Sequence, residues 1–337
     1  MTGHRSIAIR EVLEAEANEA VPADMDLWPA IRAAVASPRL SRRTFVLGPL
    51  HVSRPATLRI GAVVVLAAII LVAGLPWLGR DQGAAGAATV LNDLARAAVL
   101  QPAPVPATTP GYRYTKTDSM YLSMMGAQGG ELIAALVPKM RTIWIAPDGS
   151  GRIRETAGEM VFLSERSRAA WLAAGSPPLG RAINQDFGAQ GLSFEDLSRL
   201  PTDPSALATV IRERAQRADP PLYDEMFVVI GDLLREQTAP PQVRAALYKV
   251  AAGIPGVELV GQVHDRAGRQ GVAVAKTSTY TGVKRRHVLI IDARTSALLA
   301  EEDVILESVS WIDAKPPVVI GYATYLESGI VESLPRD

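Results

Sequence analysis

The chain has 337 residues, contains no cysteine and only four histidines, and has 5% aromatic residues. Without cysteine it can form no disulfide, no cysteine-ligated zinc site and no thiol nucleophile, and it lacks the residue that a lipoprotein acylates. Basic and acidic residues are equal in number, 35 each, whereas nucleic-acid-binding proteins show a basic surface. We therefore expect no nucleic-acid partner, and cysteine usage does not indicate the compartment.

Motifs of familiar catalytic chemistry are also missing from the sequence. It has no G-x-S-x-G nucleophile turn, no H-E-x-x-H zinc motif, no phosphate-binding loop and no spaced G-x-G-x-x-G. Nothing places a serine beside His264 or His287, and no third ligand completes a metal pattern with them. Residues 301–303 are all acidic, but without the tight glycine turn of a calcium loop we expect solvated turn charges. The sequence thus predicts no catalytic residue, no metal and no cofactor.

One long apolar run is present. Residues 60–79 are twenty consecutive residues without a charge. A helix of about 20 residues spans roughly 30 Å, the thickness of a bilayer's hydrocarbon core. The run has no polar face, unlike a buried core helix, and Trp77 stands where indole rings favour the membrane interface. It predicts one transmembrane helix over residues 60–79.

The charges on either side of the run predict its orientation. Residues 38–59 carry five arginines and no acidic residue, whereas residues 80–100 carry two arginines and two aspartates. The positive-inside rule then places the N-terminus in the cytoplasm and the C-terminal part outside the plasma membrane. An A-x-A cleavage site ends at Ala87, but the run is long for a signal peptide and 59 residues precede it. We expect an uncleaved signal anchor, with cleavage after Ala87 as the alternative.

The predicted cytoplasmic arm comprises residues 1–59. Two short helices are expected, near residues 6–20 and over residues 26–36. In the second, Asp26 can serve as the N-cap of an apolar stripe. The stripe either docks on a cytoplasmic protein or lies on the membrane, because short isolated helices are marginal in water. An arginine-rich linker that contacts anionic head groups follows. The candidate partner-binding residues are Leu27, Trp28 and Ile31.

The predicted extracytoplasmic part begins at residue 80. Residues 80–110 comprise a helix near 87–100 and a stiff linker with four prolines. In residues 111–337, strand patterns come first, then three helices, then an antiparallel meander. The strands are expected at 112–117, 141–145, 152–155, 160–163, 257–264, 271–279, 286–292, 298–310 and 318–326. The fold class is α+β, with one large, curved antiparallel sheet and helices on one face.

Six segments carry a resemblance to a known group of proteins. They are TVLNDLARAA (89–98), Tyr112-x-Tyr114, LPTDPSAL (200–207), GDLLRE (231–236), PPQVRAALYKVAAGIPGVEL (240–259) and DRAGRQGVAVA (265–275). In these segments the chain resembles uncharacterised actinobacterial-type single-span membrane proteins, over most of residues 87–300 and most specifically over 240–275.

The resemblance implies an outer domain similar in layout to the half-barrel fold of lipoprotein carriers and sigma-factor regulators. In that layout helices close the concave face of a curved antiparallel sheet. It also implies a connection with extracytoplasmic-function sigma factors. The zinc-binding anti-sigma motif, a histidine followed by Cys-x-x-Cys, is absent because the chain has no cysteine. This departure speaks against a direct anti-sigma role.

Two functions from different classes remain. In the first, the outer domain binds or senses an envelope ligand, such as a lipid or lipoprotein, in an apolar concave cleft, and the arm contacts a cytoplasmic partner. In the second, the protein is an anchored carrier or chaperone of lipid or lipoprotein. A hydrolase would need a serine or aspartate beside one of the two outer histidines. The expected cleft residues are Tyr112, Tyr114, Met124 and Trp144, with core filling as the alternative for Met124.

Overall fold

A computed structural model describes residues 83–103, 109–126, 131–180, 182–189, 197–235 and 239–335. The predicted arm and the apolar run 60–79 lie outside these residues, as do Leu27, Trp28 and Ile31. No helix among the described residues is long and apolar enough to cross a membrane.

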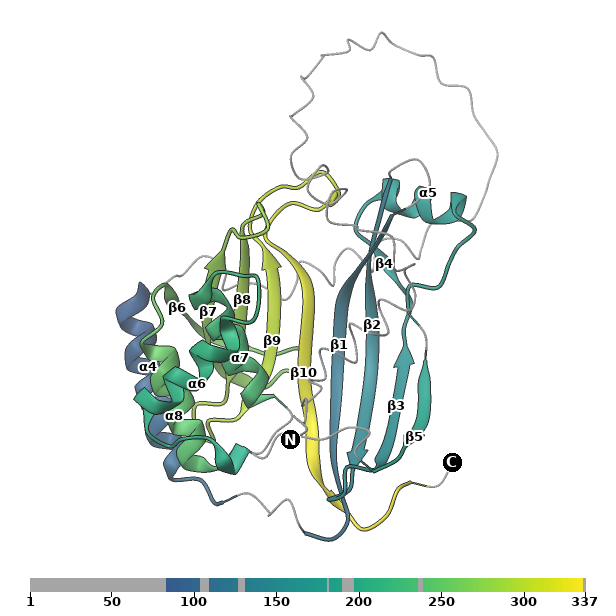
Figure 1. Cartoon of the computed structure of the whole chain (residues 1–337). Helices are drawn as coiled ribbons and strands as arrows, with labels where there is room; N and C mark the ends of the chain where they lie inside the picture. Colours follow the sequence, from purple (N-terminus) through teal and green to yellow (C-terminus); the bar gives the residue numbers. More distant parts are fainter. Residues whose placement is uncertain are drawn as a thin grey trace, which may run out of the picture.

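The described part of the chain is an α+β fold with a large antiparallel sheet (Figure 1). The strands are β1 (Tyr112–Gly126), β2 (Leu132–Ile145), β3 (Gly151–Ala157), β4 (Val161–Phe162), β5 (Ile183–Phe187), β6 (Val257–His264), β7 (Gln270–Ser278), β8 (Arg285–Ile291), β9 (Leu298–Ile305) and β10 (Val318–Val331). The helices are α4 (Gly83–Val99), α5 (Glu165–Ala173), α6 (Pro204–Ala215), α7 (Leu222–Leu234) and α8 (Pro241–Ala252). The predicted fold class is confirmed at this level.

The sheet consists of two blocks of strands that meet at one seam. Its order is β5-β3-β2-β1-β10-β9-β8-β7-β6, with β4 paired to β2. The first block comes from residues before the helical middle of the chain and the second from residues after it. Sequential strands pair from β1 to β3 and from β6 to β10, whereas β4 pairs with β2 and β5 with β3. The two blocks are joined by β1 and β10, whose register runs from Tyr112 opposite Val331 to Tyr121 opposite Gly321.

Local sequence explains where the elements begin and end. The Pro-Asp-Gly-Ser-Gly turn joins β2 to β3, with Gly149 at a φ of 81° and Asp148 accepting a hydrogen bond from the Ser150 amide at 2.9 Å. The Asp203 side chain caps α6 by accepting from the Ala206 amide at 2.9 Å. Gly253 follows α8 as its C-cap. These three predicted signals are confirmed.

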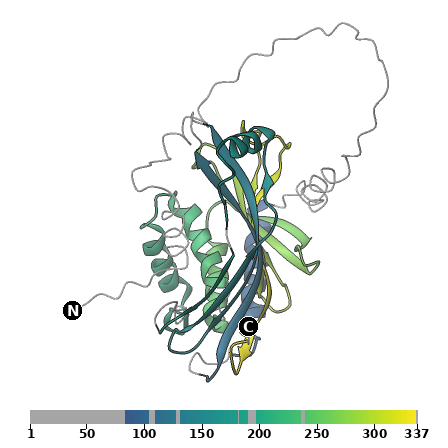
Figure 2. The same cartoon turned by 90° about the vertical axis from the view of Figure 1, so that its right-hand side faces the viewer.

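Four helices form a layer over the second block of strands. Figure 1 shows α4, α6, α7 and α8 together beside β6 to β9, and in Figure 2 the green helices lie to one side of the sheet. Their apolar side chains form the main core with inward residues of β6, β7 and β8, and Phe227 and Tyr248 are fully buried there. Helix α5 contacts β2 and β4 in the other block. The helical layer thus covers one block of the sheet, which leaves a boundary at β10 and β1.

Candidate functional site

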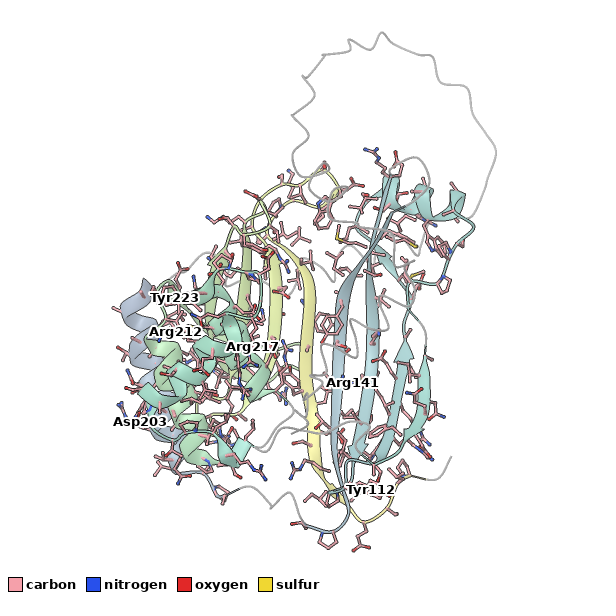
Figure 3. All side chains as sticks on the ribbon, viewed as in Figure 1. Tyr112, Arg141, Asp203, Arg212, Arg217 and Tyr223 are labelled. Atoms are coloured by element: carbon pink, nitrogen blue, oxygen red, sulfur yellow. The ribbon has the colours of Figure 1, made fainter. Side chains whose placement is uncertain are left out.

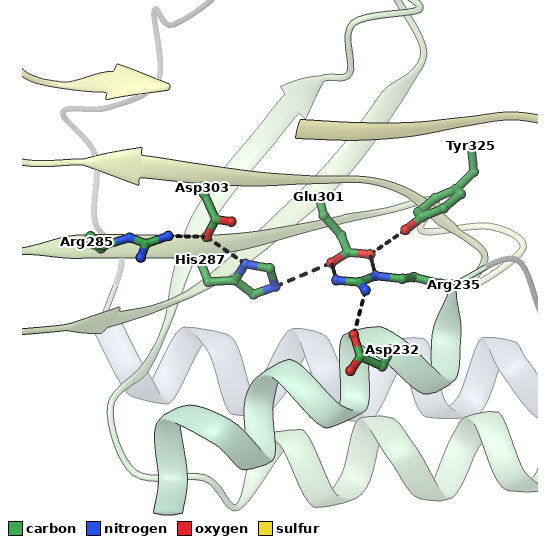
Figure 4. A network of polar contacts seen from close by, with 7 residues as sticks. All are labelled: Asp232, Arg235, Arg285, His287, Glu301, Asp303 and Tyr325. Atoms are coloured by element: carbon green, nitrogen blue, oxygen red, sulfur yellow. Dashed lines mark hydrogen bonds and ion pairs between the residues drawn. The ribbon is translucent and has the colours of Figure 1, made fainter. Parts of the chain in front are cut away.

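A network of charged side chains lies between the helical layer and the sheet (Figure 4). Its centre is Glu301 in β9, whose side chain is only 5% exposed. Arg235, directly after α7, donates from Nε and Nη2 to the two Glu301 oxygens at 2.6 and 2.8 Å. The Tyr325 hydroxyl of β10 donates to Glu301 Oε1 at 2.6 Å. Three elements distant in sequence therefore converge on one carboxylate.

His287 extends this network along the sheet. It lies opposite Asp303 in the β8–β9 register, and its Nδ1 is 3.1 Å from Asp303 Oδ1. Its Nε2 is 3.5 Å from Glu301 Oε2. The ring of Phe227 in α7 meets the imidazole edge-on, with centroids 5.9 Å apart. A Cβ at Gly231 would lie 3.2 Å from Leu289 and 3.4 Å from Glu301, so this glycine lets α7 approach the network closely.

The protonation states of the network follow from this geometry. Burial alone would lower the pKa of His287, but the hydrogen bond and charge of Asp303, together with Glu301, raise it to about 10. Burial acts to raise the pKa of Glu301, but Arg235 and His287 hold it well below its usual range. At neutral pH both ring nitrogens of His287 therefore carry protons. The imidazolium has no lone pair for a metal ion or for a substrate proton.

The other histidine of interest, His264, differs from His287 in its exposure. His264 is exposed at the end of β6, whereas the His287 side chain is 15% exposed in β8. The described residues contain no group of three or more histidine and carboxylate side chains that could hold a metal ion. We find no serine hydroxyl hydrogen-bonded to either imidazole within the described ranges.

A recess of about 240 Å³ adjoins the network where the helical layer ends. Tyr325 belongs to both features, because its ring lines the recess and its hydroxyl reaches Glu301. The lining comes from α7, α8, β1, β9, β10 and three loops. The residues are Thr115, Leu234, Ala239, Arg244, Arg269, Ala297, Leu298, Leu299, Tyr325, Leu326, Glu327 and Ser328. The wall contains both leucines and charged side chains, whereas the sequence predicts an apolar cleft.

The charged residues of the recess differ in their partners. Arg269 is paired with Asp265 at 2.6 Å, and Glu327 with Lys116 at 3.3 Å. The guanidinium of Arg244 instead donates from Nη1 to the carbonyl oxygen of Thr295 at 3.4 Å. Its Nε is buried and has no hydrogen-bond partner in the part of the chain that the structure describes, and burial lowers the pKa of this guanidinium.

The four expected cleft residues share one face of the sheet, the face opposite the recess, but Met124 lies at the far end of β1 from Tyr112, Tyr114 and Trp144. Tyr114 is paired with Trp144 across β1 and β2, and Tyr112 and Met124 stand at even spacings from Tyr114 on the same strand. Successive side chains of a strand point to opposite faces. Thr117, the neighbour of Tyr325, is on the opposite face from Tyr114, and the recess is on Thr117's side. Figure 3 shows Tyr112 at the lower end of β1.

These four residues of β1 and β2 have different contacts. Met124 packs against a cluster of buried residues that includes Met120 and Leu136, which is consistent with the core-filling alternative. The guanidinium of Arg154 lies over the Trp144 ring at 5.9 Å. Ligand binding by Tyr112, Tyr114, Met124 and Trp144 stays a prediction.

Sequence reasoning missed the residues of the network and the recess. It treated residues 301–303 as solvated turn charges, whereas Glu301 and Glu302 are buried inside β9. The available signal is the pattern Leu-Leu-Ala-Glu-Glu-Asp-Val-Ile in β9, because acidic residues flanked on both sides by apolar ones are typical of paired charges within a strand. The partners could not be identified, since Arg235 and Tyr325 are 66 and 24 residues from Glu301.

The chain was compared with protein-family models, with curated proteins and with solved structures, and no match was found in any of the three.

Proposed function

We propose that the chain is a non-enzymatic, single-span membrane protein of the plasma membrane. Its outer domain binds an envelope ligand, and its N-terminal arm contacts a cytoplasmic partner in sigma-factor-linked signalling. The uncharged run 60–79 and the five arginines of residues 38–59 support this topology. The ligand lies in the recess beside Tyr325, and the arm binds its partner through the apolar stripe that starts at Leu27.

The recess is the observation that carries the binding role. Its wall is built from residues between Thr115 and Ser328, which belong to both blocks of the sheet and to the helical layer. Ligand sites are typically concave, with an apolar wall and a few converging polar groups. A ligand there touches Tyr325, which is hydrogen-bonded to Glu301 and so connected to Arg235 at the end of α7. Binding can thus act on the contact between helices and sheet.

A second candidate is an anchored carrier or chaperone of lipid or lipoprotein. The leucines of the recess, Leu234, Leu298 and Leu326, and the helical layer on a large antiparallel sheet favour it. A carrier needs only its outer domain, whereas the sensor needs the arm. Deletion of residues 1–59 therefore separates the two roles: the sensor loses partner binding and keeps ligand binding, and the carrier keeps its whole activity.

Native mass spectrometry of the full chain, released from membranes in a mild uncharged detergent, tests the binding role. We expect a co-purifying mass that is lost on solvent extraction. In Ala297→Phe, a phenyl ring fills the recess and this mass should disappear. Ala293→Phe is the matched control, because Ala293 is exposed in the same turn. A bare chain in every preparation, or equal retention by both variants, would refute a ligand site in the recess.

A further inference from the structure

The charges around the recess do not balance. Arg269 is neutralised by Asp265, whose side chain is fully buried, and Glu327 is neutralised by Lys116. Tyr325 adds no charge, since its hydroxyl is donated to Glu301 within the network. Arg244 is left as a positive charge whose single hydrogen bond in the described part of the chain is to a carbonyl oxygen. Among the described residues, the recess is thus a partly desolvated site with one cation that no carboxylate neutralises.

The position of Arg244 in α8 makes this charge more costly. The helix starts at Pro241, its N-cap Pro240 provides no side-chain hydrogen bond, and Arg244 stands at the end of the first turn. The N-terminus of a helix carries a partial positive charge, which disfavours a cation there and favours an anion. A buried polar group without partners also costs free energy in the unliganded protein. An anion beside Arg244 would relieve both costs.

We infer that the recess binds an oxyanion, a carboxylate or phosphate group of the envelope ligand, and that Arg244 is the residue that binds it. This inference rests on the proposed function and specifies the ligand's chemistry. The planar guanidinium can donate two parallel hydrogen bonds to such a group. The leucines that surround it contact an apolar stem attached to the anion, such as the start of an acyl chain or an aliphatic side chain.

Small water-soluble probes test the inference on the full chain in an uncharged detergent. Butyrate and butyl phosphate carry the anion and a stem, acetate and inorganic phosphate carry the anion alone, and 1-butanol carries the stem alone. Each is titrated at constant ionic strength, and the rise in the thermal unfolding midpoint gives its affinity. We expect butyrate or butyl phosphate to bind most tightly and 1-butanol to have no effect. If acetate binds as tightly as butyrate, or inorganic phosphate as tightly as butyl phosphate, the site takes a free anion and not an anion on an apolar stem.

Variants assign the binding to Arg244. Arg244→Met should weaken anion binding by about tenfold or more, and Arg244→Lys by less, because a charged hydrogen bond is lost or changed. Arg212→Met is the matched control, since Arg212 is exposed on α6 (Figure 3). Should Arg244→Met fail to fold, Arg244→Lys and Ala297→Phe provide the comparison. Equal affinity in Arg244→Met and the native chain, or no anion binding to the native chain, would overturn the inference. A co-purifying ligand without an acidic group would overturn it and leave the proposed function standing.

Discussion

Arg235 and Glu301 form a bidentate ion pair that joins the end of α7 to the middle of β9, with N–O distances of 2.6 and 2.8 Å. The glutamate is buried, while the arginine side chain is 41% exposed and also contacts Asp232 at 2.7 Å. Arg235 therefore lies on the solvent side of the network, whereas Glu301 and His287 lie deeper, with side chains 5% and 15% exposed. Five predictions follow from the geometry around it and from the sequence.

Replacing the carboxylate at the centre should be costly. Glu301→Gln removes the negative charge that faces His287 and weakens both arginine hydrogen bonds. We expect the free energy of unfolding to fall by about 2 kcal/mol, because one partner of a buried charged group is removed while the others remain. Urea unfolding followed by circular dichroism measures it. Glu213→Gln, on the exposed side of α6, is the control, and a similarly small effect in both variants would contradict the prediction.

Stability should depend on pH through His287 and Glu301. The folded pKa of His287, about 10, exceeds its usual 6.5, so its contribution is complete below pH 6.5 and is lost as the pH rises toward 10. The pKa of Glu301 is held below its usual 4.5, so its contribution is present above pH 4.5 and is lost in acid. Unfolding free energies should therefore be highest between these limits.

The alkaline slope tests the histidine specifically. Each pKa unit of difference corresponds to about 1.4 kcal/mol, so the fall between pH 6.5 and 10 should be steep in the native chain. His287→Gln should remove this part of the slope, whatever its effect on stability at neutral pH. Identical alkaline slopes in the two proteins would show that His287 is not charged in the folded state.

The buried phenol of Tyr248 should contribute through one hydrogen bond. It donates to the carbonyl oxygen of Ser296 at 2.6 Å, in the turn between β8 and β9. Tyr248→Phe should cost about 1 to 2 kcal/mol, since a buried acceptor loses its donor. Tyr223→Phe, at an exposed position of α7 (Figure 3), should be neutral within error. Chemical unfolding compares them, and equal stabilities would disprove the contribution.

Gly151 should tolerate no side chain. A Cβ there would overlap the carbonyl oxygen of Trp144 and lie 2.7 Å from the ring of Phe187. Gly151→Ala should therefore destabilise the β2–β3–β5 edge by about 3 kcal/mol or more. Gly188→Ala is the control, because a Cβ at Gly188 meets nothing within 4 Å. Thermal unfolding midpoints measure both, and a Gly151→Ala midpoint equal to that of the control would reject the steric argument.

The absence of cysteine makes the proposed topology simple to test. Ser41→Cys places the only thiol of the chain in the predicted arm, and Ser205→Cys places it on the exposed start of α6. A membrane-impermeant maleimide added to intact cells should label Ser205→Cys only, and cell lysis should make Ser41→Cys reactive. The reverse pattern, or labelling of neither in intact cells, would contradict an N-terminus in the cytoplasm with the C-terminal part outside.

The elements that the sequence predicts well have strong local signals. The meander from β6 to β9 is confirmed, and each of its four strands starts within one residue of the predicted position. Its alternating apolar residues are bounded by turns such as Asp-Arg-Ala-Gly-Arg. Helices α6, α7 and α8 have caps or prolines at their starts. By contrast, β2 begins at Leu132, nine residues before the predicted strand at 141, because Leu-Ile-Ala-Ala-Leu-Val has no alternation and suits a helix equally well.

The candidate site depends on contacts that no local pattern contains. The pairing of β1 with β10 brings Thr115 near Ser328, and a bulge in β10 shifts the register between Lys116 and Thr117. Such a shift changes which side chains face the recess. The uncompensated charge of Arg244 is likewise visible only after every neighbouring charge has been placed in space.

The seam between β1 and β10 has a consequence for biosynthesis. The strand β10 ends at Val331 and pairs with both β1 and β9. Until the ribosome has supplied that strand, the two finished blocks have no hydrogen bonds to each other, and each presents a long unpaired edge. Such edges are templates for aggregation. A nonsense mutation or proteolytic cut that removes β10 would therefore expose the edges of both β1 and β9, and the shortened chain should aggregate through them.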